Sequence, residues 1–115
     1  QIKLSLARAL IRNPKVLILD DIFSLMDTDS ILEFKTNFAN ISKSRTVVLI
    51  SRELHNLMIC KKLMFFTGPV LAQFGQTINV LTETGPAQEL MKKQLKLLSP
   101  KFEQNYNSLI KSIVQ

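Results

Sequence analysis

The sequence predicts an α/β domain built on a partial parallel sheet with flanking helices. The first observation is a continuous apolar run, Val16–Leu19, that leads directly into two acids, Asp20 and Asp21. The second is another apolar run rich in β-branched residues, Thr46–Ile50. Such runs suit strands that are buried on both faces, as in a parallel sheet. A helical pattern lies between them and completes a βαβ unit, which argues for parallel pairing.

Length and composition limit the possible classes of protein. A chain of 115 residues forms at most one domain, and 46% apolar with 21% charged residues is typical of a globular protein. No apolar stretch approaches the roughly 20 residues of a membrane span. The single cysteine, Cys60, excludes an internal disulfide and a cysteine metal cluster. The chain begins at Gln1 without Met, and we expect it to be a piece of something longer.

The net charge of +6 is carried by scattered lysines and arginines. The chain has one Tyr and no Trp, so it lacks the mixture of basic and aromatic residues that single-stranded nucleic acids require. We expect no nucleic-acid partner. A solvated helix face accounts for the lysines, and a nearby anionic membrane leaflet would also favour them.

The remaining elements follow from periodicity and breakers. Residues 2–12 predict a helix that Asn13-Pro14 ends. Residues 29–41 predict an amphipathic helix that opens with a capping box made by Ser30 and Glu33. Its apolar stripe, which we assign to the core, comprises Ile31, Phe34, Phe38 and Ile41.

The second half of the chain predicts short elements and two helices. A short helix over 53–62 precedes three predicted strands, at 63–66, 70–74 and 77–82. Pro86 opens the next helix, and Ser99-Pro100 breaks it. A last amphipathic helix, 101–114, has an apolar side that needs a partner surface, made of Phe102, Tyr106, Leu109, Ile110 and Ile113.

The acids at the end of the first strand are the main chemical feature. Open α/β sheets bind ligands at the carboxyl ends of their strands, where an acid can hold a Mg²⁺-bound phosphate. The alternative is that Asp20 and Asp21 only cap the next helix or form a turn.

The surrounding motifs resemble the second half of an ABC-transporter nucleotide-binding domain. LARALIRNP (Leu6–Pro14), VLILD (Val16–Asp20) and SLMD (Ser24–Asp27) match, in order, the helix before the Walker B strand, that strand and the D-loop. The match runs without a gap over residues 3–27. It implies a P-loop NTPase-like fold of which this chain holds the C-terminal half, with the P-loop and the LSGGQ-type signature upstream of Gln1.

By this resemblance Asp20 is the Walker B aspartate, which orients Mg²⁺, usually through water. The next position is normally the glutamate that activates water, and here it is Asp21. The missing methylene sets the carboxylate back by about 1.5 Å. Because hydrolysis is sensitive to misplacement of ~1 Å, a weak or inactive base is expected. The alternative is that Asp21 works through a second water.

The D-loop resemblance assigns Ser24 and Asp27 to nucleotide binding. In the family this loop crosses to a partner domain and couples the two ATP sites. Ile22-Phe23 replace the usual Pro-Thr pair that precedes it. Further along, Thr84–Leu90 resembles the family's G-T-H-E-E-L stretch.

A second departure follows the second strand. There the family places a serine and a histidine that contacts the γ-phosphate, whereas this chain has Ser51 and Arg52. Arg52 can pair with a phosphate as a fixed cation but cannot replace the histidine's chemistry. His55 would need a shifted loop to take that role, so a histidine on a helix face is the simpler interpretation.

Together these features predict an ATP- and Mg²⁺-binding fragment of an ABC transporter with a degenerate, weakly hydrolytic site. We assign residues 1–98 to the C-terminal part of the ATP-binding domain and 99–115 to its helical extension. The resemblance implies a second nucleotide-binding domain as partner, in a heterodimer, together with a transmembrane domain at the cytoplasmic face of a membrane. The Asp20-Asp21 pair favours export.

Two other interpretations stay open from the sequence. One is an ABC-type ATPase of translation or DNA repair, although translation factors typically have N-H-L-D where this chain has S-L-M-D. The other is a non-catalytic interaction module. Whether the chain contributes to ATP hydrolysis is left open, as is the transported substrate.

Overall fold

The computed structural model describes residues 2–98 and 100–114, which form two compact units over residues 1–52 and 53–115. The first unit contains helix α1 (Ile2–Ile11), strand β1 (Val16–Asp20), the 3-10 helix η1 (Ile22–Leu25), helix α2 (Thr28–Ser42) and strand β2 (Thr46–Ile50). The second contains η2 (Leu54–Ile59), β3 (Lys62–Thr67), β4 (Val70–Gln76), α3 (Thr77–Thr82), α4 (Pro86–Leu97) and α5 (Pro100–Val114).

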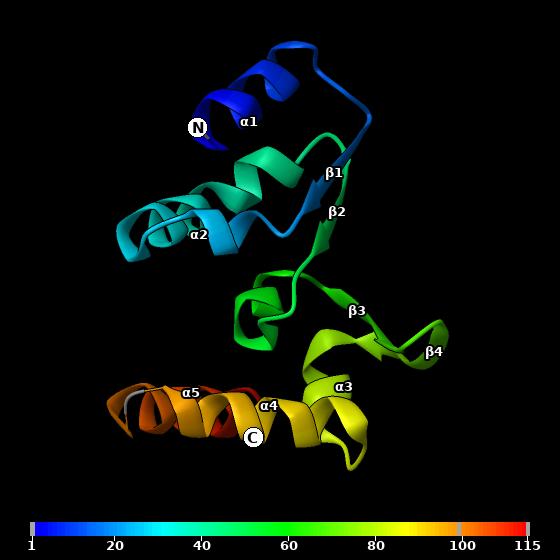
Figure 1. The fold of residues 1–115 in the computed structure, drawn as a ribbon, viewed down its shortest axis with the longest axis vertical. Helices are drawn as coiled ribbons and strands as arrows, with labels where there is room; N and C mark the ends of the chain where they lie inside the picture. The colour runs from blue at the N-terminus through cyan, green and yellow to red at the C-terminus, as the bar shows by residue number, and fades with distance from the viewer. Residues whose placement is uncertain (1, 99, 115) are drawn as a thin grey trace. The chain divides into compact units, whose positions relative to one another are not determined.

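In the first unit β1 and β2 pair in parallel, as predicted (Figure 1). The register runs from Val16 opposite Thr46 to Asp20 opposite Ile50, and α2 connects the two strands. A parallel pair requires a crossover, and a helix is the usual one. The predicted α/β class with a small parallel sheet and flanking helices is therefore confirmed, and it is consistent with part of an ABC ATPase domain.

The core of the first unit is formed by side chains from β1, η1 and α2. Its fully buried apolar residues are Leu17, Leu19, Ile22, Phe23 and Phe34. The Phe23 and Phe34 rings meet edge to face with their centroids 5.6 Å apart, a favourable arrangement for aromatic pairs. These contacts fix α2 and η1 to each other and so set the position of the turn at the end of β1.

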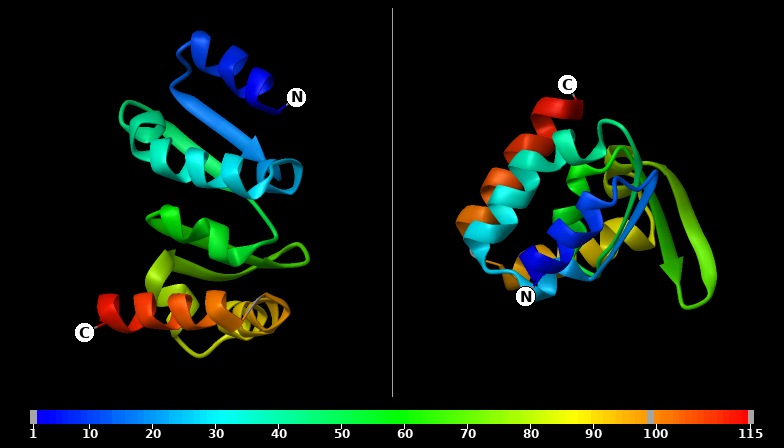
Figure 2. Two further views of the ribbon diagram at one scale, coloured as in Figure 1. Left: turned by 90° about the vertical axis from the view of Figure 1, so that its left-hand side faces the viewer. Right: turned by 90° about the horizontal axis from the view of Figure 1, so that it is seen from above.

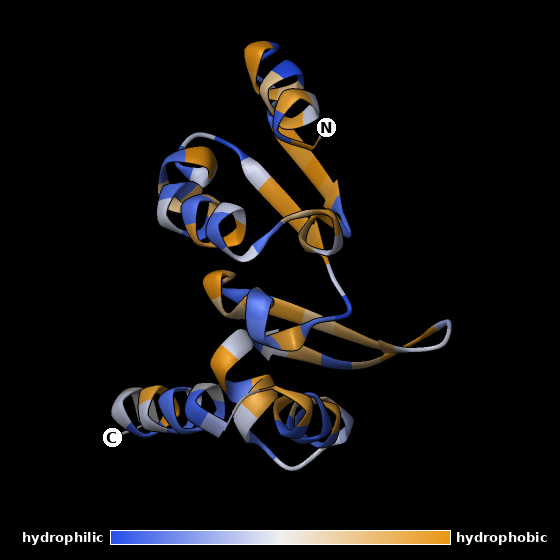
Figure 3. Ribbon diagram, turned by 60° about the vertical axis from the view of Figure 1, so that its left-hand side comes forward, coloured by the Kyte–Doolittle hydropathy of each residue, from blue (hydrophilic) through white to orange (hydrophobic). Residues whose placement is uncertain are grey.

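The prediction that the first strand is buried on both faces is wrong for the described chain. Leu17 and Leu19 are buried, but Val16 and Ile18 are 57% and 64% exposed. Successive strand side chains point to opposite faces, so the apolar run places one pair on each face. Among the described residues, only the face of β1 that carries Leu17 and Leu19 is covered. Figure 3 shows the apolar character of the strand.

The second unit is organised around an antiparallel hairpin of β3 and β4. Gly68 has φ 57°, which suits the first central position of the two-residue turn that Gly68-Pro69 makes. The register shifts between Phe65 and Phe66, where β4 carries one extra residue as a β-bulge. The two predicted strands over 63–66 and 70–74 are confirmed by this hairpin.

The predicted strand over 77–82 is wrong, because these residues form helix α3. Thr77, Val80 and Leu81 are all buried, and their spacing puts them on one face of a helix. The segment is rich in β-branched residues, which indicated a strand, but burial of one helix face against the rest of the unit outweighs this weak strand propensity. Likewise, the short helix predicted over 53–62 is a 3-10 helix over Leu54–Ile59.

Helix α4 begins at Pro86, as predicted, and its ends are tied to distant parts of the unit. The Ala87 backbone N–H donates to Gln73 Oε1 of β4 at 2.9 Å, which satisfies one of the unpaired donors of the first turn. Similarly, the Leu54 N–H at the start of η2 donates to Gln94 Oε1 at 3.0 Å. Ala87, Met91 and Leu95 form the buried face of the helix.

The last helix, predicted over 101–114, is confirmed as α5, and it runs beside α4 (Figure 2). The Tyr106 hydroxyl lies 4.0 Å from Met58 Sδ, and burial raises the pKa of Tyr106 to about 12. Leu109 on the same helix is 49% exposed. The side chains of Phe102 and Ile113, and the whole of Ser99, lie outside the described residues. None of the described helices is long and apolar enough to cross a membrane.

Candidate functional site

The candidate site lies at the carboxyl edge of the β1–β2 pair. Asp20 is the last residue of β1 and pairs with Ile50, the last residue of β2. The Asp21 N–H donates to the Ile50 carbonyl oxygen at 2.8 Å, so pairing continues one residue beyond the strand. Because the strands are parallel, Ser51 and Arg52 leave β2 at the same edge at which Asp20 and Asp21 leave β1. The structure therefore brings the two departures from the family pattern to one edge.

Asp20 is exposed and lies on the same face of β1 as Val16 and Ile18, because strand side chains alternate. Within the described residues, no three His, Cys, Asp or Glu side chains gather to hold a metal ion. Asp20 thus offers one accessible carboxylate. That fits Mg²⁺, which proteins usually hold with one or two carboxylates, waters and the phosphate oxygens of a substrate.

Asp21 adopts a left-handed backbone conformation, with φ 54° and ψ 35°. Its side chain is engaged by Ser24 within the same turn. The Ser24 hydroxyl lies 2.8 Å from the Asp21 carbonyl oxygen and 3.1 Å from Asp21 Oδ2, so it donates to acceptors of that one residue. Neither the backbone conformation nor this contact is among the sequence predictions. The one available indication was the residue type, since Asp and Asn are enriched at positive φ.

Asp27 caps helix α2. Its Oδ1 accepts a hydrogen bond from the Ser30 N–H at 2.7 Å. The predicted capping box of Ser30 and Glu33 is therefore wrong: Ser30 is the third helical residue, and Glu33 instead pairs with Lys3 Nζ at 2.9 Å. Asp27 competes successfully because an Asp is at least as good a cap as a Ser, and it lets the helix start one turn earlier.

The hydrogen bond from the Ser30 backbone lowers the pKa of Asp27 below its ordinary value of 3.8, and the Ser30 side chain and Lys3 act in the same direction. A depressed folded-state pKa means that Asp27 contributes stability above pH 3.8, which is lost as the pH falls through the depressed value. Asn caps a helix about as well as Asp and does not titrate. When the pH is lowered from about 6 to about 3, we therefore expect the stability of the Asp27→Asn variant to fall less than that of the unmodified chain. Thermal melts followed by circular dichroism at both pH values measure this, and equal losses would contradict it.

Arg52 is exposed and follows β2 directly, whereas His55 lies in η2 of the second compact unit. The His55 side chain is 14% exposed, and its Nε2 lies 3.9 Å from Glu53 Oε2. The expected position of His55 on a helical segment is confirmed. At the candidate edge the position after Ser51 is occupied by Arg52, whereas His55 lies further along the chain in η2.

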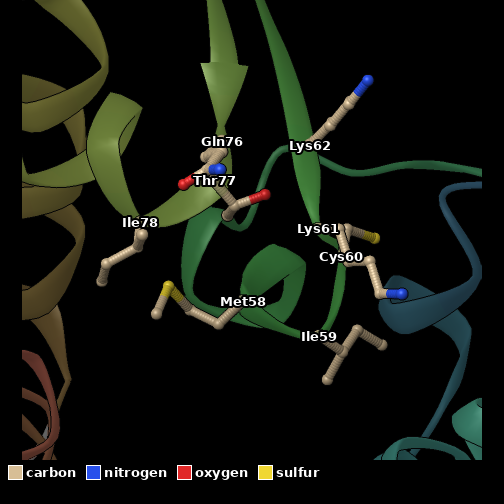
Figure 4. A pocket seen from close by; sticks show the side chains of 8 residues that line it. All are labelled: Met58, Ile59, Cys60, Lys61, Lys62, Gln76, Thr77 and Ile78. Carbon is tan, nitrogen blue, oxygen red and sulfur yellow. The ribbon is translucent and has the colours of Figure 1, made fainter. Parts of the chain in front are cut away.

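The second unit contains a hollow of about 530 Å³ at the end of the β3–β4 hairpin (Figure 4). It is lined by Met58, Ile59, Cys60, Lys61, Lys62, Gln76, Thr77 and Ile78. The Thr77 hydroxyl is buried and finds no hydrogen-bond partner among the described residues, but its oxygen is also closed to solvent. Burial raises the pKa of the Cys60 thiol, which disfavours the reactive thiolate. This hollow therefore offers no arrangement for catalysis.

Comparisons with known proteins support the resemblance to an ABC transporter domain. No family model matches the chain. Curated relatives include ABC transporter B family member 2 of Dictyostelium discoideum, 32% identical over 93 residues, and P-glycoprotein 14 of Caenorhabditis elegans, 33% identical over 92 residues. Leptomycin B resistance protein pmd1 of Schizosaccharomyces pombe is also 33% identical over 92 residues.

These alignments cover 80–81% of the chain but only 7% of the length of each of the three relatives. The similarity therefore extends over most of the chain and concerns a small segment of much longer proteins. It supports an ABC transporter domain, and specifically an ATP-binding fragment of one.

Proposed function

We propose that this chain is the C-terminal part of an ATP-binding domain in an ABC exporter, and that the ATP site to which it contributes is degenerate. The observation that carries the proposal is the carboxyl edge of β1 and β2. At this edge Asp20 is accessible, and Asp21 and Arg52 stand where the resemblance places a glutamate and a histidine. In this proposal the site keeps the residue that supports ATP binding and lacks the residues that support hydrolysis.

In this proposal Asp20 orients a Mg²⁺ ion that accompanies ATP, through water. The ion would supply charge neutralisation for the phosphates. The exposed carboxylate at the end of β1 is suited to this task because it needs no burial of an unpaired charge. Arg52 acts as a fixed cation toward a phosphate oxygen, which supports nucleotide binding but does not replace the chemistry of a histidine.

Asp21 is a poor base for two reasons. It is one methylene shorter than glutamate, and its carboxylate lies within hydrogen-bonding distance of the Ser24 hydroxyl. A general base has to reach the proton that it removes, with about 2.6–3.2 Å between heavy atoms. A short side chain that is engaged in its own turn meets this condition badly.

The partners follow from the kind of protein to which the relatives belong. We propose that the domain works with a second nucleotide-binding domain, in a heterodimer, and with a transmembrane domain at the cytoplasmic face of a membrane. The relatives, which include an ABC transporter B family member and a leptomycin B resistance protein, support transport over translation or DNA repair. Ser24 and Asp27 would lie near the partner domain by the D-loop resemblance, although Asp27 also caps α2.

The test is to restore both departures in the assembled transporter. We expect Asp21→Glu combined with Arg52→His to raise single-turnover ATP hydrolysis at this site by at least about tenfold, because a well-placed general base contributes roughly 10²–10⁴-fold. The measurement is release of labelled phosphate from one bound ATP per site.

The matched control makes the same chemical changes away from the edge, with Asp29→Glu and Arg12→His, both exposed. The control should leave hydrolysis unchanged. An unchanged rate in the site variant, with ATP binding intact, would refute the degenerate site. Failure of the unmodified transporter to bind MgATP at all would refute the proposed function itself.

A further inference from the structure

The conformation of Asp21 is unusual in this chain. Among the described non-glycine residues, positive φ occurs at Asn13, with φ 48°, and at Asp21, with φ 54°. A left-handed backbone is strained for most L-residues, and Asn and Asp tolerate it best because their short polar side chains bond locally. Residue type and conformation thus agree at both positions. An aspartate at position 21 suits the backbone.

The turn that contains Asp21 is held at both ends. At its start the Asp21 N–H is paired to Ile50 across the sheet, at 2.8 Å. Directly after it, Ile22 and Phe23 are only 4% and 2% exposed. Rotating the Asp21 backbone out of the left-handed region would break the first contact or expose these side chains. The conformation is therefore imposed by the unit, and the side chain has to fit it.

The Ser24 hydroxyl is the contact that joins the two ends of this turn. It donates toward the carbonyl oxygen and the carboxylate of Asp21, at 2.8 and 3.1 Å. A hydroxyl has one proton, so two acceptors from a single residue hold it over the turn in either orientation.

We propose that Asp21 and Ser24 form a side-chain lock that maintains the left-handed turn between β1 and η1, with Ser24 as its positioning residue. The lock commits the Asp21 carboxylate to the turn and sets the direction in which the chain leaves Asp20. Its consequence for hydrolysis rests on the proposed function. Position 21 holds an aspartate because the turn uses the side chain, so the residue serves the backbone in place of activating water.

The experiment is amide hydrogen exchange of the assembled transporter without nucleotide, followed in the peptide that spans residues 20–27. We expect Ser24→Ala and Asp21→Ala each to exchange up to about tenfold faster than the unmodified protein, as loss of a hydrogen bond implies. Ser24→Ala removes the hydroxyl from both acceptors, whereas Asp21→Ala removes the carboxylate and leaves the Asp21 carbonyl oxygen as an acceptor. Because loss of the carboxylate contact is common to both variants, their effects should not add in the double variant.

Two conservative variants separate the lock from a general loss of structure. Ser24→Thr keeps the hydroxyl, and Asp21→Asn keeps an acceptor and a residue type that tolerates positive φ. Both variants should exchange at the rate of the unmodified protein. A peptide from the β3–β4 hairpin, in the other compact unit, should not change in any variant.

Three results would each overturn the lock: exchange at the unmodified rate in both alanine variants, additive effects in the double variant, or an Asp21→Asn variant as fast as Asp21→Ala. None of these depends on ATP. The exchange result therefore stands or falls separately from MgATP binding, on which the proposed function depends.

Discussion

Replacing Phe34 with alanine is expected to lower the free energy of opening of the first compact unit by about 3–5 kcal/mol. Phe34 is 5% exposed, and its ring meets Phe23 edge to face at 5.6 Å and Phe38 at 5.7 Å. Truncating a buried phenylalanine costs about 3–5 kcal/mol, through lost transfer free energy and the cavity that remains. That is a large part of the stability of a small domain. The free energy of opening, measured by exchange of the β1 and β2 amides, should fall by this amount.

The matched control for Phe34→Ala is Leu32→Ala on the same helix. Leu32 is 65% exposed, so its truncation should change the free energy of opening by no more than about 0.5 kcal/mol. Amides of β3 and β4 serve as an internal reference, since they belong to the other compact unit. Equal effects of the two variants would show that Phe34 is not part of the core, and the packing described for α2 would be wrong.

The second large effect is expected in the other unit, at Leu95 of α4. Leu95 is 4% exposed and lies on the helix face that also buries Ala87 and Met91. We expect Leu95→Ala to lower the free energy of opening of the β3 and β4 amides by about 2–5 kcal/mol. The same exchange experiment measures it, with the β1 and β2 amides as reference.

Leu97, two residues further along the same helix, provides a control with identical chemistry. It is 88% exposed, so Leu97→Ala removes the same atoms without leaving a cavity. Its expected effect is within about 0.5 kcal/mol. If Leu97→Ala were as destabilising as Leu95→Ala, the hydrophobic face of α4 would be assigned to the wrong side.

The strongest periodic patterns determined the elements that define the fold. Val16–Leu19 and Thr46–Ile50 became the parallel strands. Of the apolar stripe assigned to the core, Phe34 is buried, and Ile31, Phe38 and Ile41 are half-buried. Pro86 marked the start of α4 correctly. These predictions succeed because long apolar runs and proline constrain the backbone locally. The order of the motifs also placed the acids at the carboxyl edge of the sheet.

Competition between nearby residues decided the helix start at Asp27. Two caps were available within one turn, Asp27 and Ser30, and periodicity does not choose between them. Similarly, the residues of α3 carry strand propensity, and only the burial of Thr77, Val80 and Leu81 on one face makes them a helix. The secondary-structure propensities of these residues are weak, and the free energy gained by packing them in the unit is larger.

What the sequence alone determined about this protein is the α/β class, the parallel pairing and the presence of acids and Arg52 at one edge. Only the tertiary structure decided what those acids do locally. The left-handed turn at Asp21 exists because β2 and the buried Ile22 and Phe23 fix the chain on either side of it. The conformation at position 21 depends on contacts between residues far apart in the sequence, such as Asp21 and Ile50. A local sequence pattern does not contain information about such contacts.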